Sequence, residues 1–217
     1  MNRIEIIQLL EETGIIAVIR AKEEDDLDGI VKALLKGGVR ALEITMTTPY
    51  AVDVIKNLCQ TVKLEEPFLI GAGTVLDAET AQAVIHAGAS FIVSPIYKTE
   101  LVHMAHRYDR PIFPGAFTPT EILNAWEGGA DVVKIFPAGR FGPKYFRDIH
   151  GPLPQIKLTP TGGVNIDNVA DFIKNGASFV GVGTALLDKT MIANHDWDAL
   201  AQHARKFIEA VKQGRNV

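Results

Sequence analysis

The sequence predicts an α/β protein with a single domain, a (β/α)8 TIM barrel that spans residues 1–217. In four places a helical segment ends at a glycine and a short apolar strand follows within a few residues. These glycines are Gly38, Gly88, Gly129 and Gly176, so the repeat length is 41 to 50 residues. One βα unit needs about half of that length, so each repeat holds two units and four repeats predict eight.

The expected strands are short, and most are apolar throughout, as parallel strands buried on both faces are. In chain order they are residues 15–20, 41–45, 68–71, 91–94, 111–113, 132–136, 157–159 and 179–183. No linker rich in proline, serine or glycine divides the 217 residues, which is a usual size for one closed barrel.

Helix-start residues lie between the expected strands. The clearest is Thr118-Pro119-Thr120-Glu121, where Thr118 can cap, Pro119 suits the first turn and Glu121 completes a capping box. Thr48-Pro49 predicts a second start of this kind. A doubly wound open sheet is the competing fold, but Arg20-Ala21-Lys22-Glu23 lacks its glycine fingerprint.

Residues 196–217 predict a final amphipathic helix that closes the barrel or packs at a subunit interface. Its candidate packing residues recur at helical spacing and are Trp197, Leu200, Ala201, Ala204, Phe207, Ile208 and Val211.

Composition argues against several classes of partner. Hydrophobic residues make up 47% of the chain, and the net charge of -4 gives no electrostatic reason to expect a nucleic acid. The single cysteine, Cys59, excludes an internal disulfide framework and is typical of a reducing compartment. Residues 1–10 lack the apolar run of a signal peptide, and no stretch approaches a membrane span. We therefore expect a cytoplasmic protein without a membrane partner.

Lys134 is the most informative candidate for chemistry. It lies in the middle of the apolar expected strand 132–136, where lysine is rare. Desolvation disfavours the charged amine and lowers its pKa, and a neutral amine can attack a ketone to form a Schiff base. The alternative is an edge strand whose Lys134 points into water or pairs with a carboxylate.

Glu43 is a second ionisable residue inside an apolar strand, and the carboxyl ends of barrel strands form one active site. A carboxylate and a lysine in one interior can shift each other's pKa and exchange a proton. The alternative is a structural buried ion pair.

Glycine-rich turns follow the last two expected strands, at Thr161-Gly162-Gly163 and at Gly181-Val182-Gly183-Thr184. Exposed backbone N–H groups at these two strand ends are the usual phosphate site of a (β/α)8 barrel. The alternative is that the glycines only permit tight turns.

Seven strings in order, over nearly the whole chain, carry a resemblance: Leu42-Glu43-Ile44-Thr45, Gly71-Ala72-Gly73-Thr74-Val75-Leu76, Val93-Ser94-Pro95, Pro114-Gly115, Val133-Lys134-Ile135-Phe136-Pro137-Ala138, Pro160-Thr161-Gly162-Gly163-Val164 and Gly181-Val182-Gly183-Thr184. Together they resemble the class I aldolases that cleave 2-keto-3-deoxy-6-phosphogluconate and 4-hydroxy-2-oxoglutarate.

This resemblance implies a homotrimeric barrel with Lys134 as the Schiff-base lysine and Glu43 as the acid and base. Its other implied site residues are Thr74, Pro95 and Phe136 around pyruvate, Thr161 near the reacting carbonyl, and Gly162, Gly163 and Thr184 at the distal phosphate. Gly183 is added to the predicted phosphate-binding residues, because it belongs to the last glycine-rich turn. The family often has serine at the position of Thr184, which keeps the hydroxyl.

The sequence departs from the family at Thr47, where many members have an arginine for the pyruvate carboxylate. Our hypothesis is that Arg20, at the end of the first expected strand, supplies that guanidinium, whose planar fork suits a carboxylate. The alternative is that Arg20 pairs with Glu43 or a surface acid, and that backbone N–H groups bind the carboxylate.

We expect no metal and no cofactor, because the covalent iminium on Lys134 takes the role of a divalent cation. His103 and His106 are three residues apart, but on an expected outer helix, where surface histidines are the simpler interpretation.

Two other functions remain open: a phosphate-binding barrel isomerase or epimerase without an imine, and a barrel retained for ligand binding or assembly. Within the aldolase interpretation the substrate is the gluconate compound, its galactonate epimer or 4-hydroxy-2-oxoglutarate.

Overall fold

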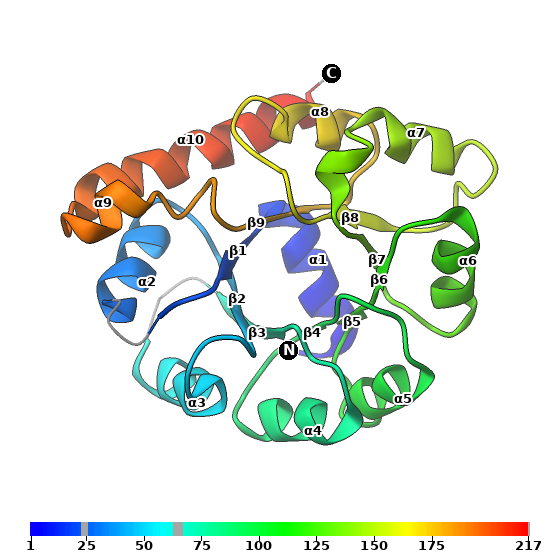
Figure 1. Ribbon diagram of the computed structural model, residues 1–217, viewed down its shortest axis with the longest axis horizontal. Coiled ribbons are helices and arrows are strands. Elements are labelled where there is room, and N and C mark those ends of the chain that lie inside the picture. The colour runs from blue at the N-terminus through cyan, green and yellow to red at the C-terminus, as the bar shows by residue number, and fades with distance from the viewer. Residues whose placement is uncertain (23–25, 63–66, 217) are drawn as a thin grey trace.

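The computed structural model describes residues 1–22, 26–62 and 67–216, and it shows parallel strands inside a ring of helices (Figure 1). The strands are β1 Ile15–Ile19, β2 Ala41–Thr45, β3 Leu69–Gly73, β4 Ile92–Val93, β5 Ile112–Phe113, β6 Gly115–Ala116, β7 Val133–Ile135, β8 Leu158–Pro160 and β9 Val180–Val182. They form a curled sheet ordered β5-β4-β3-β2-β1-β9 and a second sheet ordered β6-β7-β8.

The helices alternate with the strands along the chain. They are α1 Arg3–Thr13, α2 Leu27–Lys36, α3 Ala51–Thr61, α4 Ala78–His86, α5 Thr99–Arg107, α6 Pro119–Glu127, the 3-10 turn η1 Ala138–Arg140, α7 Lys144–His150, α8 Val169–Lys174, α9 Lys189–Ala193 and α10 Trp197–Arg215. This alternation confirms the expected α/β class.

The chain between Ile112 and Ala116 joins the two sheets. The expected strand 111–113 continues beyond Phe113 but is divided into β5 and β6, because Pro114 between them has no N–H to donate to a ladder. The Pro114 carbonyl still accepts a 2.9 Å hydrogen bond from Lys134 N. On the other side, Thr161, which directly follows β8, forms an isolated parallel bridge with Gly181 of β9.

Several expected strand limits are displaced by one or two residues. Arg20, Phe136 and Gly183 lie just beyond β1, β7 and β9, and β3 runs on to Gly73. Arg20 and Phe136 are thus exposed at the carboxyl ends of their strands.

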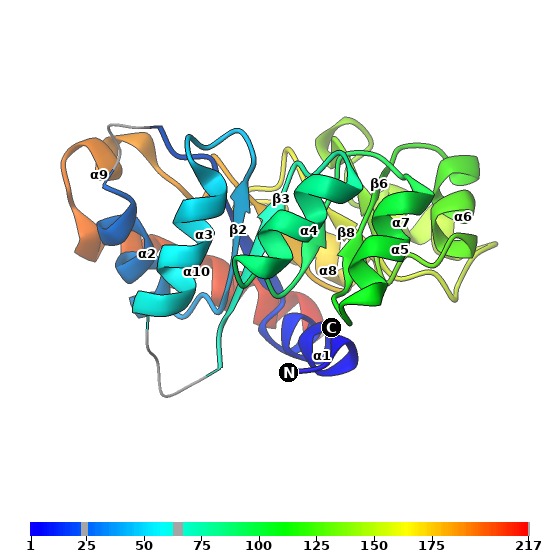
Figure 2. The ribbon, with the colours of Figure 1, turned by 90° about the horizontal axis from the view of Figure 1, so that it is seen from below.

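The sequence analysis does not predict helix α1, although Asn2 and Glu5 have the spacing of a capping box. The side chains of Asn2 and Glu5 cap it reciprocally, and it ends at Gly14, whose φ of 74° is left-handed. Figure 2 shows α1 below the strands, with both termini beside it. Its apolar face closes the amino-terminal end of the ring, where it packs with a core of Ile6, Leu10, Ile16, Ala41, Leu69, Phe91, Val93, Phe113, Val132 and Phe179.

The two expected helix starts have different outcomes. Thr118 accepts from Glu121 N, and Glu121 accepts from Thr118 N, so this capping box is confirmed. The start at Thr48-Pro49 is wrong. A turn in which Thr48 N donates to Thr45 O delays α3 to Ala51, which follows Tyr50 with a left-handed φ of 53°. The Thr48 hydroxyl is buried and has no hydrogen-bond partner among the residues that the structure describes.

The final helix, α10, packs against α8 and α2 and confirms the expected amphipathic pattern. Five of the expected packing residues are buried, namely Leu200, Ala201, Ala204, Phe207 and Val211, while Trp197 and Ile208 are partly buried.

Phe207→Ala tests the contribution of α10 to stability. Phe207 is fully buried, so its truncation should lower the free energy of unfolding by about 3 to 5 kcal/mol. Ile208→Ala, one residue further along the same helix and only partly buried, is the matched control and should lose less. Urea denaturation followed by circular dichroism measures both, and equal losses would contradict this packing.

Candidate active site

Lys134 lies at the centre of β7 and is 5% exposed, so the expected apolar interior is confirmed. Its ammonium nitrogen lies 4.9 Å from the centroid of the Phe136 ring. Burial is the main influence on this amine and lowers its pKa from the ordinary 10.5, while Glu43 raises it and Arg20 lowers it further. The uncharged amine is therefore favoured more than on a surface lysine.

Glu43 lies in the middle of β2 and is 2% exposed. Its carboxylate fills the space beside Gly73, where an added Cβ would overlap Oε1. Burial raises the pKa of Glu43, and the charges of Lys134 and Arg20 act against this rise. Within the described residues no ion pair joins Glu43 directly to Lys134. Burial thus shifts both groups toward their neutral forms.

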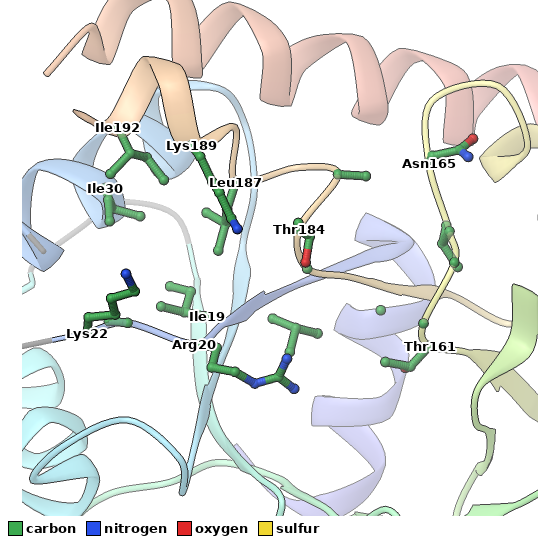
Figure 3. Close-up of a pocket in the computed structure, with 18 of the residues that line it drawn as sticks. Ile19, Arg20, Lys22, Ile30, Thr161, Asn165, Thr184, Leu187, Lys189 and Ile192 are labelled. Carbon is green, nitrogen blue, oxygen red and sulfur yellow. The ribbon is translucent and has the colours of Figure 1, made fainter. Parts of the chain in front are cut away.

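Arg20 brings a permanent positive charge to this pair. It follows β1, whose Val18 is in register with Glu43 on β2. The Arg20 side chain extends across a cavity toward Thr161 (Figure 3). Since its charge lowers the pKa of both Glu43 and Lys134, Arg20 favours the ionised carboxylate and the neutral amine together.

The cavity beside Arg20 has a volume of about 760 Å³ and is open at the carboxyl ends of the strands. Most of the predicted site residues line it, namely Arg20, Phe136, Thr161, Gly162, Gly163, Gly183 and Thr184. Gly162 and Gly163 have φ angles of 81° and 84°, a conformation that suits glycine. A Cβ on Gly163 would lie 2.7 Å from the Cα of Gly139, so close backbone packing also requires this glycine.

The remaining predicted residues lie outside this cavity. Pro95 lines a smaller cavity of about 270 Å³, and Phe136 borders both cavities. Thr47 is exposed, and its hydroxyl is hydrogen bonded to that of Thr45 at 2.8 Å. Thr74 follows β3 with a φ of 60°, which is strained for a β-branched residue. Lys134 on β7 and Glu43 on β2 are buried and are not part of the cavity wall.

Other residues that line the larger cavity were not predicted as site residues, among them Lys22, Ile30, Asn165, Leu187, Lys189 and Ile192. Lys189 and Ile192 come from α9, a five-residue helix that the repeat pattern does not predict. The sequence offered one signal for these cavity residues. Lys22 and Lys189 are polar and follow soon after two expected strand ends.

The two histidines expected on the surface differ in their exposure to solvent. His103 is exposed, but His106 is only partly exposed, and its Nε2 is 3.0 Å from Oδ2 of Asp131. The same Asp131 carboxylate accepts from Ile112 N and pairs with Arg3, so His106 belongs to a polar cluster below the strands. Among the described residues, no group of three or more His, Cys, Asp or Glu side chains is placed to hold a metal ion.

A family profile described as "Aldolase: KDPG and KHG aldolase" matches residues 6–203. The chain belongs to this family of aldolases. KDPG is 2-keto-3-deoxy-6-phosphogluconate, and KHG is 4-hydroxy-2-oxoglutarate. The family is one of lyases, and it is the family that the sequence strings resemble.

Several sequence relatives are aldolases of the same family. The chain is 36% identical to the 2-dehydro-3-deoxy-phosphogluconate aldolase of Pseudomonas aeruginosa, over 95% of this chain and 93% of that protein. It is 32% identical to the KHG/KDPG aldolase of Escherichia coli, over 94% and 95% of the two chains. It is also 32% identical to the 2-dehydro-3-deoxy-6-phosphogalactonate aldolase of Escherichia coli, over 92% and 95%.

Solved aldolase structures have the same fold. A structure described as native KDPGal superposes with a TM-score of 0.83 at 31% identity and covers 94% of this chain and 96% of its own. KDPG aldolase from Legionella pneumophila, with pyruvate captured as a covalent carbinolamine intermediate, has a TM-score of 0.82 at 31% identity, over 92% and 96%. Among the described residues, no helix of the aldolase is long and apolar enough to cross a membrane.

The burial of Lys134 predicts a pH-dependent stability. Because the folded chain lowers its pKa below 10.5, the unfolded chain binds a proton that the native aldolase disfavours. Burial of Lys134 therefore lowers the free energy of unfolding by its full amount at pH values below the folded-state pKa. This loss of stability disappears as the pH rises to about 10.5. Lys134→Met in a Glu43→Gln background should therefore raise the free energy of unfolding by about 1 to 2 kcal/mol at neutral pH.

The gain should shrink toward zero as the pH approaches 10.5. Chemical denaturation at a series of pH values, with Glu43→Gln alone as the reference, measures it. A gain that stays constant between pH 7 and 10.5 would show that Lys134 titrates normally.

Proposed function

We propose that this aldolase uses class I chemistry, with Lys134 as the Schiff-base lysine, and cleaves 2-keto-3-deoxy-6-phosphogluconate to pyruvate and D-glyceraldehyde 3-phosphate. The observation that carries the proposal is the burial of Lys134, which lowers its pKa and favours the nucleophilic neutral amine. The carbinolamine captured in the related Legionella pneumophila enzyme supports the same chemistry.

The first steps form the imine. Neutral Lys134 attacks the C2 ketone of the substrate and gives a carbinolamine. Loss of water from the carbinolamine gives an iminium, which draws electrons from the neighbouring C3–C4 bond. The iminium itself is the electron sink, so this chemistry requires no metal and no separate cofactor.

Glu43 then acts as base and acid. As a carboxylate it accepts the proton of the C4 hydroxyl, through a water, while the C3–C4 bond breaks. The electron pair of that bond forms an enamine on Lys134, and the C4 carbon leaves as the aldehyde. The protonated Glu43 can return its proton to C3 of the enamine, and hydrolysis of the resulting imine releases pyruvate and the free amine. A carboxyl group with a raised pKa suits both directions of transfer.

The proposed subsites follow the open end of the strands. Thr74, Pro95 and Phe136 surround the pyruvate portion, and Thr161 lies near the reacting carbonyl. The distal phosphate is bound by backbone N–H groups and a hydroxyl in the turns that contain Gly162, Gly163, Gly183 and Thr184. These turns line the larger cavity, and their glycines leave the backbone accessible.

Arg20 is the proposed ligand of the substrate carboxylate, because Thr47 carries no charge. Its guanidinium lines the cavity and is close enough to the Lys134 and Glu43 pair to shift both pKa values. A carboxylate bound there would be held beside the amine that attacks the adjacent C2 carbon.

A second candidate substrate is the C4 epimer of this compound. The galactonate epimer differs only at C4, and the chain is similar to a 2-dehydro-3-deoxy-6-phosphogalactonate aldolase and to the structure described as KDPGal. Cleavage of 4-hydroxy-2-oxoglutarate to pyruvate and glyoxylate uses the same steps. The ratio of kcat/KM values for the two epimers and for 4-hydroxy-2-oxoglutarate ranks these substrates.

We also propose that the two sheets form one closed (β/α)8 barrel and one domain over residues 1–217. The backbone link through Pro114 and the bridge between Thr161 and Gly181 support closure on both sides. We further propose that the protein is a homotrimer in the cytoplasm. Light scattering of the purified protein tests the trimer.

Trapping with borohydride tests the Schiff base. Incubation with pyruvate and sodium borohydride should add one reduced pyruvyl group at Lys134, which peptide mass spectrometry locates. Lys134→Ala should lose the adduct, whereas Lys144→Ala, which changes an exposed lysine of α7, should keep it. A folded protein that forms no adduct would exclude class I catalysis.

Arg20→Met tests the carboxylate site. Loss of a charge-assisted hydrogen bond should raise KM for 2-keto acid substrates by about 10- to 100-fold. Arg107→Met, which changes an exposed arginine of the outer helix α5, should leave KM unchanged. Steady-state kinetics on both variants decide the question, and an unchanged KM for Arg20→Met would remove this role.

A further inference from the structure

The charge of the larger cavity is opposite to that of the chain. The protein has 26 acidic residues, 22 Lys and Arg residues and a net charge of -4. Yet the charged side chains among the described residues of the cavity wall are Arg20, Lys22 and Lys189, all positive. A cavity with this lining attracts anionic ligands into an otherwise acidic protein.

The positive charges are separated along the cavity. Arg20 follows β1 and extends toward Thr161, while Lys189 points into the cavity from the start of α9 (Figure 3). Lys189 comes five residues after Thr184, whose turn is part of the proposed phosphate site. The arrangement suits a substrate with one anionic group at each end.

Lys189 is available for a ligand. The neighbouring carboxylate of Asp188 is engaged elsewhere, because its Oδ1 accepts hydrogen bonds of 2.9 Å from Thr190 N and Met191 N. Within the described parts of the chain, no carboxylate lies within ion-pair distance of the Lys189 amine. A bound anion would therefore meet a cation that is not already neutralised.

The surroundings of Lys189 strengthen its effect. Ile30, Leu187 and Ile192 line the same part of the cavity and contribute apolar walls. Charges interact more strongly beside apolar surface than in bulk water. The glycine-rich turns offer only neutral donors, whereas a phosphate ester carries close to two negative charges at neutral pH.

We propose that Lys189 is a specificity-determining residue, which binds the distal phosphate and makes the site prefer phosphorylated 2-keto acids over the same acids without phosphate. This inference rests on the proposed aldolase function and assigns its phosphate preference to a residue outside the glycine-rich turns.

Lys189→Gln tests the inference with two substrates that differ only in the phosphate. We expect kcat/KM for 2-keto-3-deoxy-6-phosphogluconate to fall about tenfold, mostly through KM, because the contact exists before and during the reaction. The value for unphosphorylated 2-keto-3-deoxygluconate should stay within about twofold. Lys189→Arg should restore most of the loss, and Lys174→Gln, an exposed lysine of α8 outside the cavity, is the control.

Inorganic phosphate is a second probe of the same contact. As a competitive inhibitor it should bind about tenfold more weakly to Lys189→Gln than to the wild type or to Lys174→Gln. Equal losses for both substrates, or no loss for either, would overturn the role of Lys189.

Pyruvate trapping separates this failure from a failure of the proposed function. If Lys134 forms the borohydride-reduced adduct in wild type and in Lys189→Gln, class I chemistry stands whatever the substrate ratio. If wild type forms no adduct, the proposed function itself is wrong.

Discussion

Burial of the Lys134 amine among apolar strands governs the chemistry that we propose for this site. An ammonium group held among apolar strands loses its hydration, so its neutral form is favoured. The same burial acts in the opposite sense on Glu43, whose neutral form is the protonated one. One structural cause therefore acts on both groups to which we assign catalytic roles, and Arg20 adjusts the balance by favouring neutral Lys134 and ionised Glu43.

The fold supplies this environment by closing one end of the ring of strands and leaving the other open. Helix α1 and three phenylalanines, Phe91, Phe113 and Phe179, fill the amino-terminal end with packed side chains. The carboxyl ends instead carry glycines and polar residues around a cavity of about 760 Å³. Lys134 lies between these two regions, so it is shielded from bulk water yet close to the open end.

The sequence predicts the parts of the aldolase that repeat or that place charge in an apolar strand. The βα pattern, the burial of Lys134 and Glu43, and the cavity position of Arg20 follow from such local rules. Tertiary packing decides the features that were missed, such as the late start of α3 after Tyr50 and the pairing of His106 with Asp131. The short helix α9 has too few residues for a periodic pattern, so its side chains reach the cavity without a clear sequence signal.

The titration of Lys134 distinguishes a desolvated amine from an ordinary surface amine. The rate at which an amine-reactive reagent labels Lys134, followed by mass spectrometry across pH, gives its pKa. A desolvated Lys134 should have a pKa clearly below the ordinary 10.5. This pKa should rise in Arg20→Met and fall further in Glu43→Gln, because these variants remove a like and an opposite charge. Titration near 10.5, unmoved by either variant, would contradict the desolvation of Lys134.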